Sequence, residues 1–79
     1  MSKRPDTEIY YKRLGKAVVD ARKKAGLRQE DLAHKIKMSR PALANMEVGR
    51  QRIQLHHVFM IERALGCAKN FLINKARGK

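Results

Sequence analysis

Apolar side chains recur every three or four residues through most of the chain, which is the spacing of one buried face of an α-helix. In the first segment this spacing predicts a helix with a buried stripe of Leu14, Val18, Ala21 and Ala25. Asp6 or Thr7 is expected to cap the start of this helix and Gly26 to end it, because short polar side chains and glycine favour those positions.

Two short helices follow, separated by a turn at residues 37–39. They are predicted from Gln29 to about Ile36 and from Arg40 to Glu47. The buried positions are Leu32, Ala33 and Ile36 in the first and Leu43 and Met46 in the second. Pro41 lies in the first turn of the second helix, where its missing amide hydrogen breaks no bond, so Ser39 is expected to cap the amide of Ala42 instead.

A fourth helix is predicted from about Leu55 to Leu65, with Gly66 as its end. Its apolar set is Leu55, Val58, Phe59, Ile61 and Leu65. A short fifth helix is expected around residues 70–73. The pattern therefore predicts an all-α fold, a compact bundle of about five short helices.

The length of 79 residues allows one small domain and leaves no room for a separate ligand-sensing domain. We expect this domain at residues 6–74, with a flexible basic tail at 1–5 and a basic tail at 75–79. The single Cys67 excludes an internal disulfide, as is usual in a reducing compartment. Neither a signal peptide nor a segment of membrane-spanning length is apparent, so a cytoplasmic, nucleoid-associated protein without a membrane partner is expected.

Charge narrows the choice of partner. Lys and Arg number 19 against 7 Asp and Glu, which gives a formal net charge of +12 and favours a polyanionic partner. The excess gathers around the two short helices, where only Glu30, Asp31 and Glu47 oppose the basic residues Arg22, Lys23, Lys24, Arg28, Lys35, Lys37, Arg40, Arg50 and Arg52. This asymmetry favours nucleic acid over a generally soluble basic surface.

Two short helices that cross steeply can place the second in the major groove of DNA while the first spans the backbone. If Leu43 and Met46 are buried, the opposite face of the second helix carries Arg40, Pro41, Ala44 and Asn45. Arginine pairs with guanine and asparagine with adenine, while proline and alanine can contact a thymine methyl group. These four residues are therefore predicted to read bases.

A second set of residues is predicted to hold phosphates. The first amides of the helix that starts at Gln29 carry partial positive charge, and further donors flank the same surface. The predicted phosphate contacts are Arg28, Gln29, Ser39, Arg50, Gln51 and Arg52. Such contacts fix register without reading sequence, and the binding that they give weakens with salt.

Together these residues resemble the repressor and Cro-like (Xre) helix-turn-helix family over about residues 14–66. The resemblance rests on Gln29, Leu32, Ala33, Ser39, Arg40, Leu43, Glu47, Gly49, Leu65 and Gly66. It implies a lambda repressor-like domain with its helix-turn-helix unit at 29–47, in which Gln29, Arg40, Pro41 and Asn45 face DNA. It also implies that Arg22 pairs with Glu47, and an arginine on an otherwise apolar face needs such a partner in any case.

Three positions depart from the family pattern. Arg28 stands where the family usually has a short capping residue, and Lys37 where glycine is common in the turn. Glu62 stands where a small apolar residue is usual, which puts the packing of the fourth helix in question. Met60, Cys67 and Phe71 are then either ordinary core and surface residues or a dimer interface, and the sequence leaves both open.

Other functions fit less well. The sequence has no glycine-rich phosphate loop, no carboxylate pair and no cysteine with a base arranged around it, so neither an enzyme nor a cofactor, metal or small-molecule site is expected. Adjacent His56 and His57 would point about 100 degrees apart on a helix, which makes a shared metal difficult. The few aromatic residues lie outside the basic unit, which disfavours an RNA-binding module.

The sequence thus predicts a sequence-specific regulator that binds double-stranded DNA as a homodimer on a palindromic operator, as a repressor or autoregulator. The alternative is an antitoxin or restriction controller that works with a protein partner. A toxin, RNA polymerase or an anti-repressor would be such a partner. A non-specific polyanion-binding module is the third reading.

Overall fold

The computed structural model describes residues 5–78, with residues 5–7 described by their backbone alone. Within this range the chain forms five helices and no strand, which confirms the predicted all-α class. The helices are α1 (Pro5–Lys24), α2 (Gln29–Lys35), α3 (Arg40–Glu47), α4 (Leu55–Leu65) and α5 (Phe71–Ala76). None of the described helices is long and apolar enough to cross a membrane.

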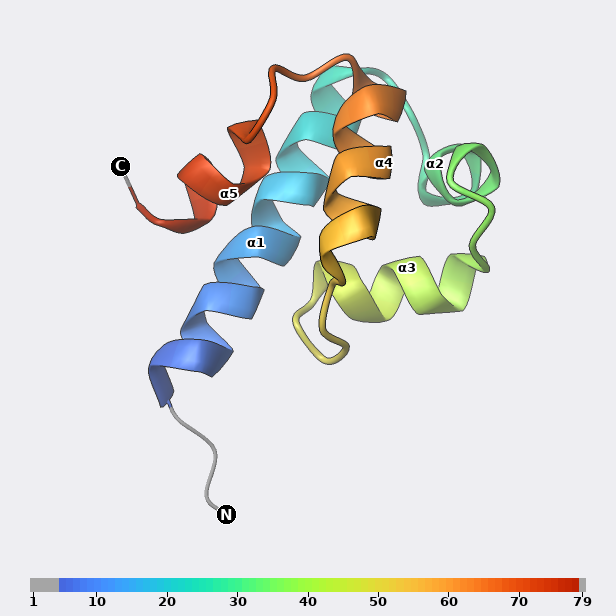
Figure 1. Ribbon diagram of the computed structural model, residues 1–79. Coiled ribbons are helices and arrows are strands. Elements are labelled where there is room, and N and C mark those ends of the chain that lie inside the picture. Colours follow the sequence, from blue (N-terminus) through green and yellow to red (C-terminus); the bar gives the residue numbers. More distant parts are fainter. Residues whose placement is uncertain (1–4, 79) are drawn as a thin grey trace.

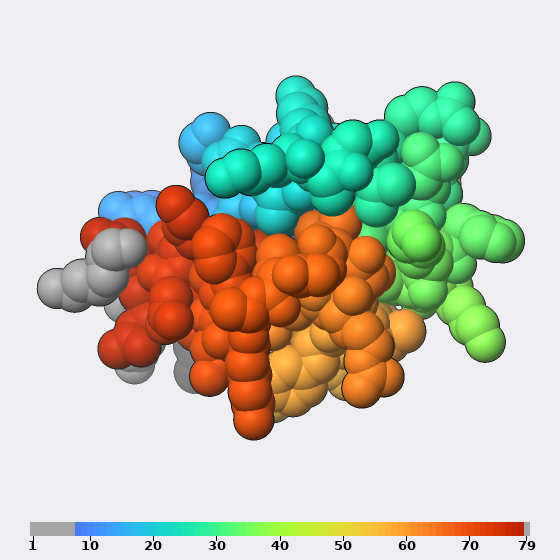
Figure 2. Space-filling model, turned by 90° about the horizontal axis from the view of Figure 1, so that it is seen from above, coloured from blue at the N-terminus to red at the C-terminus, as the bar shows by residue number. Residues whose placement is uncertain are grey.

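The long helix α1 is the centre of the bundle and contacts α3, α4 and α5 (Figure 1). Helix α2 packs on α3 and α4, and the turn between α2 and α3 lies at the edge of the molecule. Seen from above, α5 and α2 lie at opposite ends of the molecule (Figure 2). The helix-turn-helix unit is therefore remote from the C-terminal helix.

The core follows the predicted stripes in most places. Its members are Leu14, Ala17, Val18, Leu32, Ala33, Ile36, Leu43, Met46, Ile53, Val58, Ile61, Leu72 and Ala76. Three predicted core residues are exposed. Ala25 follows the last residue of α1, and Leu55 and Phe59 lie on an exposed face of α4, with 60% and 45% of their surfaces accessible.

Both ends of the domain differ from the sequence-based expectation. Helix α1 begins at Pro5, so Asp6 and Thr7 lie inside its first turn and neither precedes the helix as a cap. Residues 1–4 of the expected N-terminal tail and Lys79 lie outside the described residues. Helix α5 continues to Ala76, which is fully buried, so the expected tail at 75–79 begins inside the folded domain.

The predicted helix ends in the middle of the chain are present. Ser39 Oγ accepts the amide of Ala42 at 3.2 Å at the start of α3, and Gly66 ends α4 in the left-handed conformation. Lys37 has a φ of +55° in the turn between α2 and α3. A lysine there costs about 1 kcal/mol relative to glycine, which has no Cβ to clash.

Glu62, which replaces the small apolar residue usual in the family, has a structural role on α4. Its side chain is buried on α4 and accepts the amides of Asn70 at 3.2 Å and Leu72 at 3.1 Å. These amides belong to the start of α5, where helical amides have no partner within the helix. The carboxylate therefore attaches α5 to α4.

Burial and the nearby Glu62 charge raise the pKa of the Cys67 thiol.

The contact between α1 and α3 depends on Gly15. A Cβ atom at this position would lie 2.5 Å from the carbonyl oxygens of both Met46 and Glu47. Because these are backbone atoms, they cannot move aside as a flexible side chain would. Glycine thus lets α1 run directly against the last turn of α3, and this contact sets the orientation of the predicted reading helix.

Candidate nucleic-acid interface

A buried ion pair joins α1 to the end of α3. Arg22 Nε donates to Glu47 Oε2 at 2.8 Å, and Arg22 Nη2 donates to Glu47 Oε1 at 3.3 Å. Arg22 Nη1 also donates to the carbonyl of Leu27 at 2.9 Å. Only 7% of Arg22 and 5% of Glu47 are exposed, so each charge depends on the other for compensation. The predicted ion pair is therefore present.

The same carboxylate extends the network to α2 and to the predicted reading face. Gln29 Nε2 donates to Glu47 Oε1 at 2.8 Å, and Arg40 Nη1 donates to Gln29 Oε1 at 3.3 Å. Gln29 was predicted only as a phosphate contact, because nothing in the spacing of residues 29, 40 and 47 indicates this bridge. The network links α1, α2 and α3, and its exposed end is the guanidinium of Arg40.

Helix α3 presents the four predicted reading residues on the side away from Leu43 and Met46, which are buried. Arg40 and Pro41 are exposed at the start of the helix, and Ala44 and Asn45 are half-buried one turn later. Arg40 and Asn45 are thus accessible to a ligand from the same helix.

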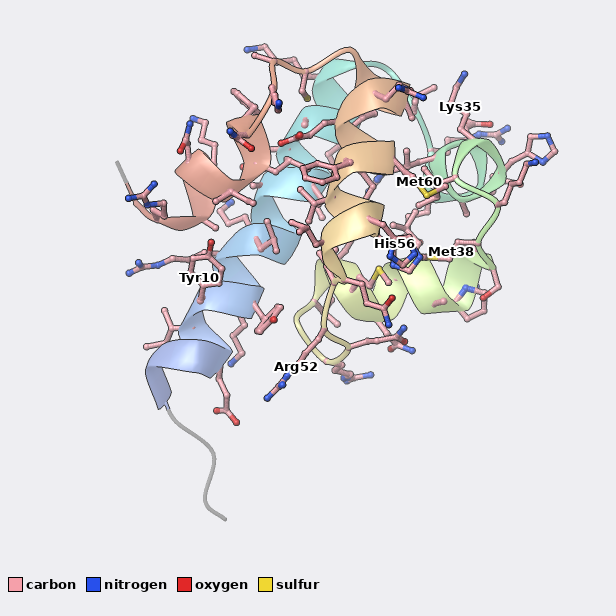
Figure 3. The ribbon with its side chains drawn as sticks, in the orientation of Figure 1. Tyr10, Lys35, Met38, Arg52, His56 and Met60 are labelled. Carbon is pink, nitrogen blue, oxygen red and sulfur yellow. The ribbon has the colours of Figure 1, made fainter. Side chains whose placement is uncertain are left out.

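The loop after α3 carries the other predicted donors. Arg50, Gln51 and Arg52 are all exposed. The carbonyl of Asn45 accepts the amides of Arg50 at 2.9 Å and Gln51 at 3.2 Å, which folds the loop back against α3. Arg52 extends towards the N-terminal half of α1 (Figure 3), where its Cζ lies 5.6 Å from the centre of the Tyr11 ring. No role of Tyr11 at this surface was predicted from the sequence.

The sequence profile of the helix-turn-helix family matches residues 19–72, which is more than half of the chain and includes the whole network. The chain belongs to the Xre/Cro-like helix-turn-helix family. Its function is that of a DNA-binding transcriptional regulator.

Solved structures of regulators share this helix-turn-helix fold. Two structures of the clp gene regulator ClgR from Corynebacterium glutamicum are 25% identical to the chain, with TM-scores of 0.81 and 0.83. Each match covers 87% of this chain, and 88% and 73% of the ClgR chains. A mutant of the restriction-modification controller protein C.Esp1396I is 17% identical over 87% of each chain, with a TM-score of 0.77. No curated protein sequence matches the chain.

Arg28, which directly precedes α2, is held differently from the other predicted phosphate donors. Its guanidinium donates to both carboxylate oxygens of Asp31, at 3.2 and 3.4 Å, and lies 3.4 Å from Glu30. The side-chain hydrogen bond to Asp31 raises the pKa of Arg28, while the Arg28 amide, at 2.9 Å, lowers the pKa of Asp31. Asp31 therefore caps α2 and uses donors that a phosphate would need.

The residues of the predicted dimer surface do not come together. Cys67 and Phe71 line a groove of about 590 Å³ between α1 and the α4–α5 end of the molecule, with Ala21 and Leu65 among its walls. Met60 lies on the other side of α4, near Met38 and His56 (Figure 3). The expectation of one shared patch fails because α4 separates its members.

His56 and His57 are closer than the helical spacing indicated. Their ring centres are 4.1 Å apart, so the side chains turn towards each other. His57 Nδ1 is buried and has no hydrogen-bond partner among the described residues. Burial lowers the pKa of His57, and the neighbouring His56 adds to the effect. Among the described side chains, residues 8–78, no three of the metal-binding types gather at one point.

Proposed function

We propose that the protein is a homodimeric, sequence-specific regulator that binds a palindromic operator and represses transcription by covering a promoter. The observation that carries this proposal is the hydrogen-bonded network from Arg22 through Glu47 and Gln29 to Arg40. It fixes the angle between the two helices of the unit and restrains the Arg40 guanidinium before DNA is bound. Restraint in advance reduces the entropy lost on binding.

The proposal divides the surface by role. Arg40 and Asn45 read a guanine and an adenine, and Pro41 and Ala44 contact a thymine methyl group. Gln29, Ser39, Arg50, Gln51 and Arg52 hold the phosphate backbone. Arg28 contributes less to phosphate binding, because Asp31 and Glu30 already compensate its charge.

A second copy of the chain is the proposed occupant of the exposed face of α4. Leu55 and Phe59 lie one turn apart on this face, and paired large apolar side chains in contact with water favour an interface. Helix α4 begins directly after residues 48–54, the proposed phosphate-binding loop, so a dimer through this face keeps both copies of α3 near one side of the DNA. We prefer this face to Met60, Cys67 and Phe71, which α4 separates.

The experiment that tests the function is selection of duplexes from a random pool by the purified protein. We expect a palindrome with half-sites about one helical turn apart, bound at least about a thousandfold more tightly than random DNA. Recovery of unrelated sequences, or a preference for single-stranded RNA, would contradict the proposal.

Asn45→Ala tests base reading within that operator. Because one bidentate contact is lost, we expect a cost of about 1–3 kcal/mol confined to one position in each half-site. Asn74→Ala, an exposed asparagine on α5, is the matched control and should leave the preference unchanged. Equal losses on all sequences would exclude direct reading by Asn45.

Replacing Leu55 and Phe59 together by serine tests the dimer face. We expect sedimentation to show a shift from dimer to monomer and operator affinity to fall, while the monomer keeps its helical fold because both side chains are exposed on it. Ile9→Ser, at another exposed apolar side chain, is the control. A dimer that persists in the double variant would place the interface elsewhere.

A further inference from the structure

The N-terminal half of α1 touches the phosphate-binding loop outside the helix-turn-helix unit. A Cβ atom at Gly49 would lie 2.7 Å from Cγ and 3.1 Å from Cα of Lys12, so only glycine lets α1 pass this close. The next residue towards the N-terminus, Tyr11, is half-buried, and its ring lies 5.6 Å from the Arg52 guanidinium carbon. The position of Tyr11 relative to the loop is therefore fixed by packing.

Arg52 and Arg28 have different kinds of partner for their guanidinium groups. Asp31 accepts hydrogen bonds from the Arg28 guanidinium and compensates its charge. Within residues 9–78, no acidic side chain forms an ion pair with Arg52. A ring under a guanidinium attracts the cation through its π-electrons, while the N–H groups at the edge of the guanidinium stay free for a phosphate. Tyr11 thus restrains Arg52 without using its charge or its donors.

We propose that Tyr11 is a positioning residue that holds Arg52 ready for the DNA backbone, which makes α1 part of the DNA interface. This inference rests on the proposed function, because it needs Arg52 to contact phosphate. Tyr10, the neighbouring residue, is also half-buried and lines a pocket with Arg13 and Arg77 (Figure 3). Its ring meets the Tyr11 ring edge to face, with the ring centres 6.1 Å apart, so the two rings support each other.

A double-mutant cycle on the full chain tests the proposal, with operator affinity measured by fluorescence anisotropy over a range of salt concentrations. Tyr11→Leu is expected to weaken binding about two- to fivefold, the equivalent of an exposed cation–π contact. In an Arg52→Ala background the same substitution should change affinity by less than about 1.5-fold, because the contact is already gone. Tyr11→Phe keeps the ring and should bind like the unmodified protein.

Two outcomes would overturn the proposal: equal effects of Tyr11→Leu with and without Arg52, or no rescue by Tyr11→Phe. If Tyr11→Leu does not fold, the side-chain protons of Arg52 in the unmodified protein give the answer by NMR. An upfield ring-current shift supports the contact and its absence overturns it. If the unmodified protein shows no salt-dependent duplex binding at all, the proposed function fails, whereas normal binding without coupling overturns only the role of Tyr11.

Discussion

Replacing Glu47 by alanine removes the group on which three helices depend. The carboxylate accepts two hydrogen bonds from Arg22 and one from Gln29, at 2.8, 3.3 and 2.8 Å. Without it, the guanidinium of Arg22 stays buried with only the Leu27 carbonyl as a partner. We therefore expect Glu47→Ala to be one of the most destabilising single substitutions outside the apolar core.

The magnitude follows from the burial of the pair. Breaking a buried ion pair by removing one partner costs about 3–5 kcal/mol, because an uncompensated charge remains in the interior. A domain of this length has a total folding free energy of about 4–12 kcal/mol. For a small domain, a loss of 3 kcal/mol or more lowers the melting temperature by about 12 °C or more.

Urea denaturation followed by circular dichroism measures this loss, with Glu30→Ala as the matched control. Glu30 has 62% of its side chain exposed and pairs only at the surface, so its replacement should change stability by less than about 0.5 kcal/mol. The double variant Arg22→Met and Glu47→Leu removes both charges and should be more stable than Glu47→Ala alone. If Glu47→Ala costs no more than Glu30→Ala, the reasoning about the buried network is refuted.

Three further predictions concern the rest of the domain. Glu62→Ala should lower the free energy of unfolding by about 1–3 kcal/mol, because it removes the acceptor of the α5 amides. Faster hydrogen exchange at Leu72 would show that α5 loosens, and unchanged exchange would exclude this role of Glu62. Lys37→Gly should stabilise the fold by about 1 kcal/mol, because φ is +55° there, and a lower melting temperature would contradict this. Burial lowers the pKa of His57, so the unfolded chain binds a proton more readily than the folded one, and stability should fall as the pH drops through the ordinary histidine range. Denaturation at pH 7.5 and 5.5 should show a smaller decline in stability for His57→Gln than for the unmodified protein.

The sequence predicted the helix-turn-helix unit closely because local rules decide its structure. The spacing of Leu43 and Met46 and the Ser39 cap define α3 within a few residues of the chain. The bounds of α4 and its end at Gly66 follow from the same kind of local pattern. The ion pair of Arg22 and Glu47 was also expected: a charged residue on an apolar stripe requires a partner, and the family resemblance implied that Glu47 is this partner.

What the sequence did not predict depends on contacts between distant segments. The capping of α5 by Glu62 joins residues from two helices, and helical spacing assigns a side chain to a face without saying what covers that face. For the same reason Leu55 and Phe59 looked like core residues. The bridge from Glu47 through Gln29 to Arg40 needs three elements in place, and neither charge nor periodicity contains that information.

The close contact at Gly15 has a consequence for how such a regulator changes during evolution. Since α3 is oriented by its own backbone against α1, its docking angle does not depend on the identity of the side chains at Pro41, Ala44 or Asn45. Under the proposed reading role of these residues, substitutions there would select a new operator without disturbing the scaffold. Gene duplication followed by substitutions on this one face would be enough to produce paralogues that do not bind each other's operators.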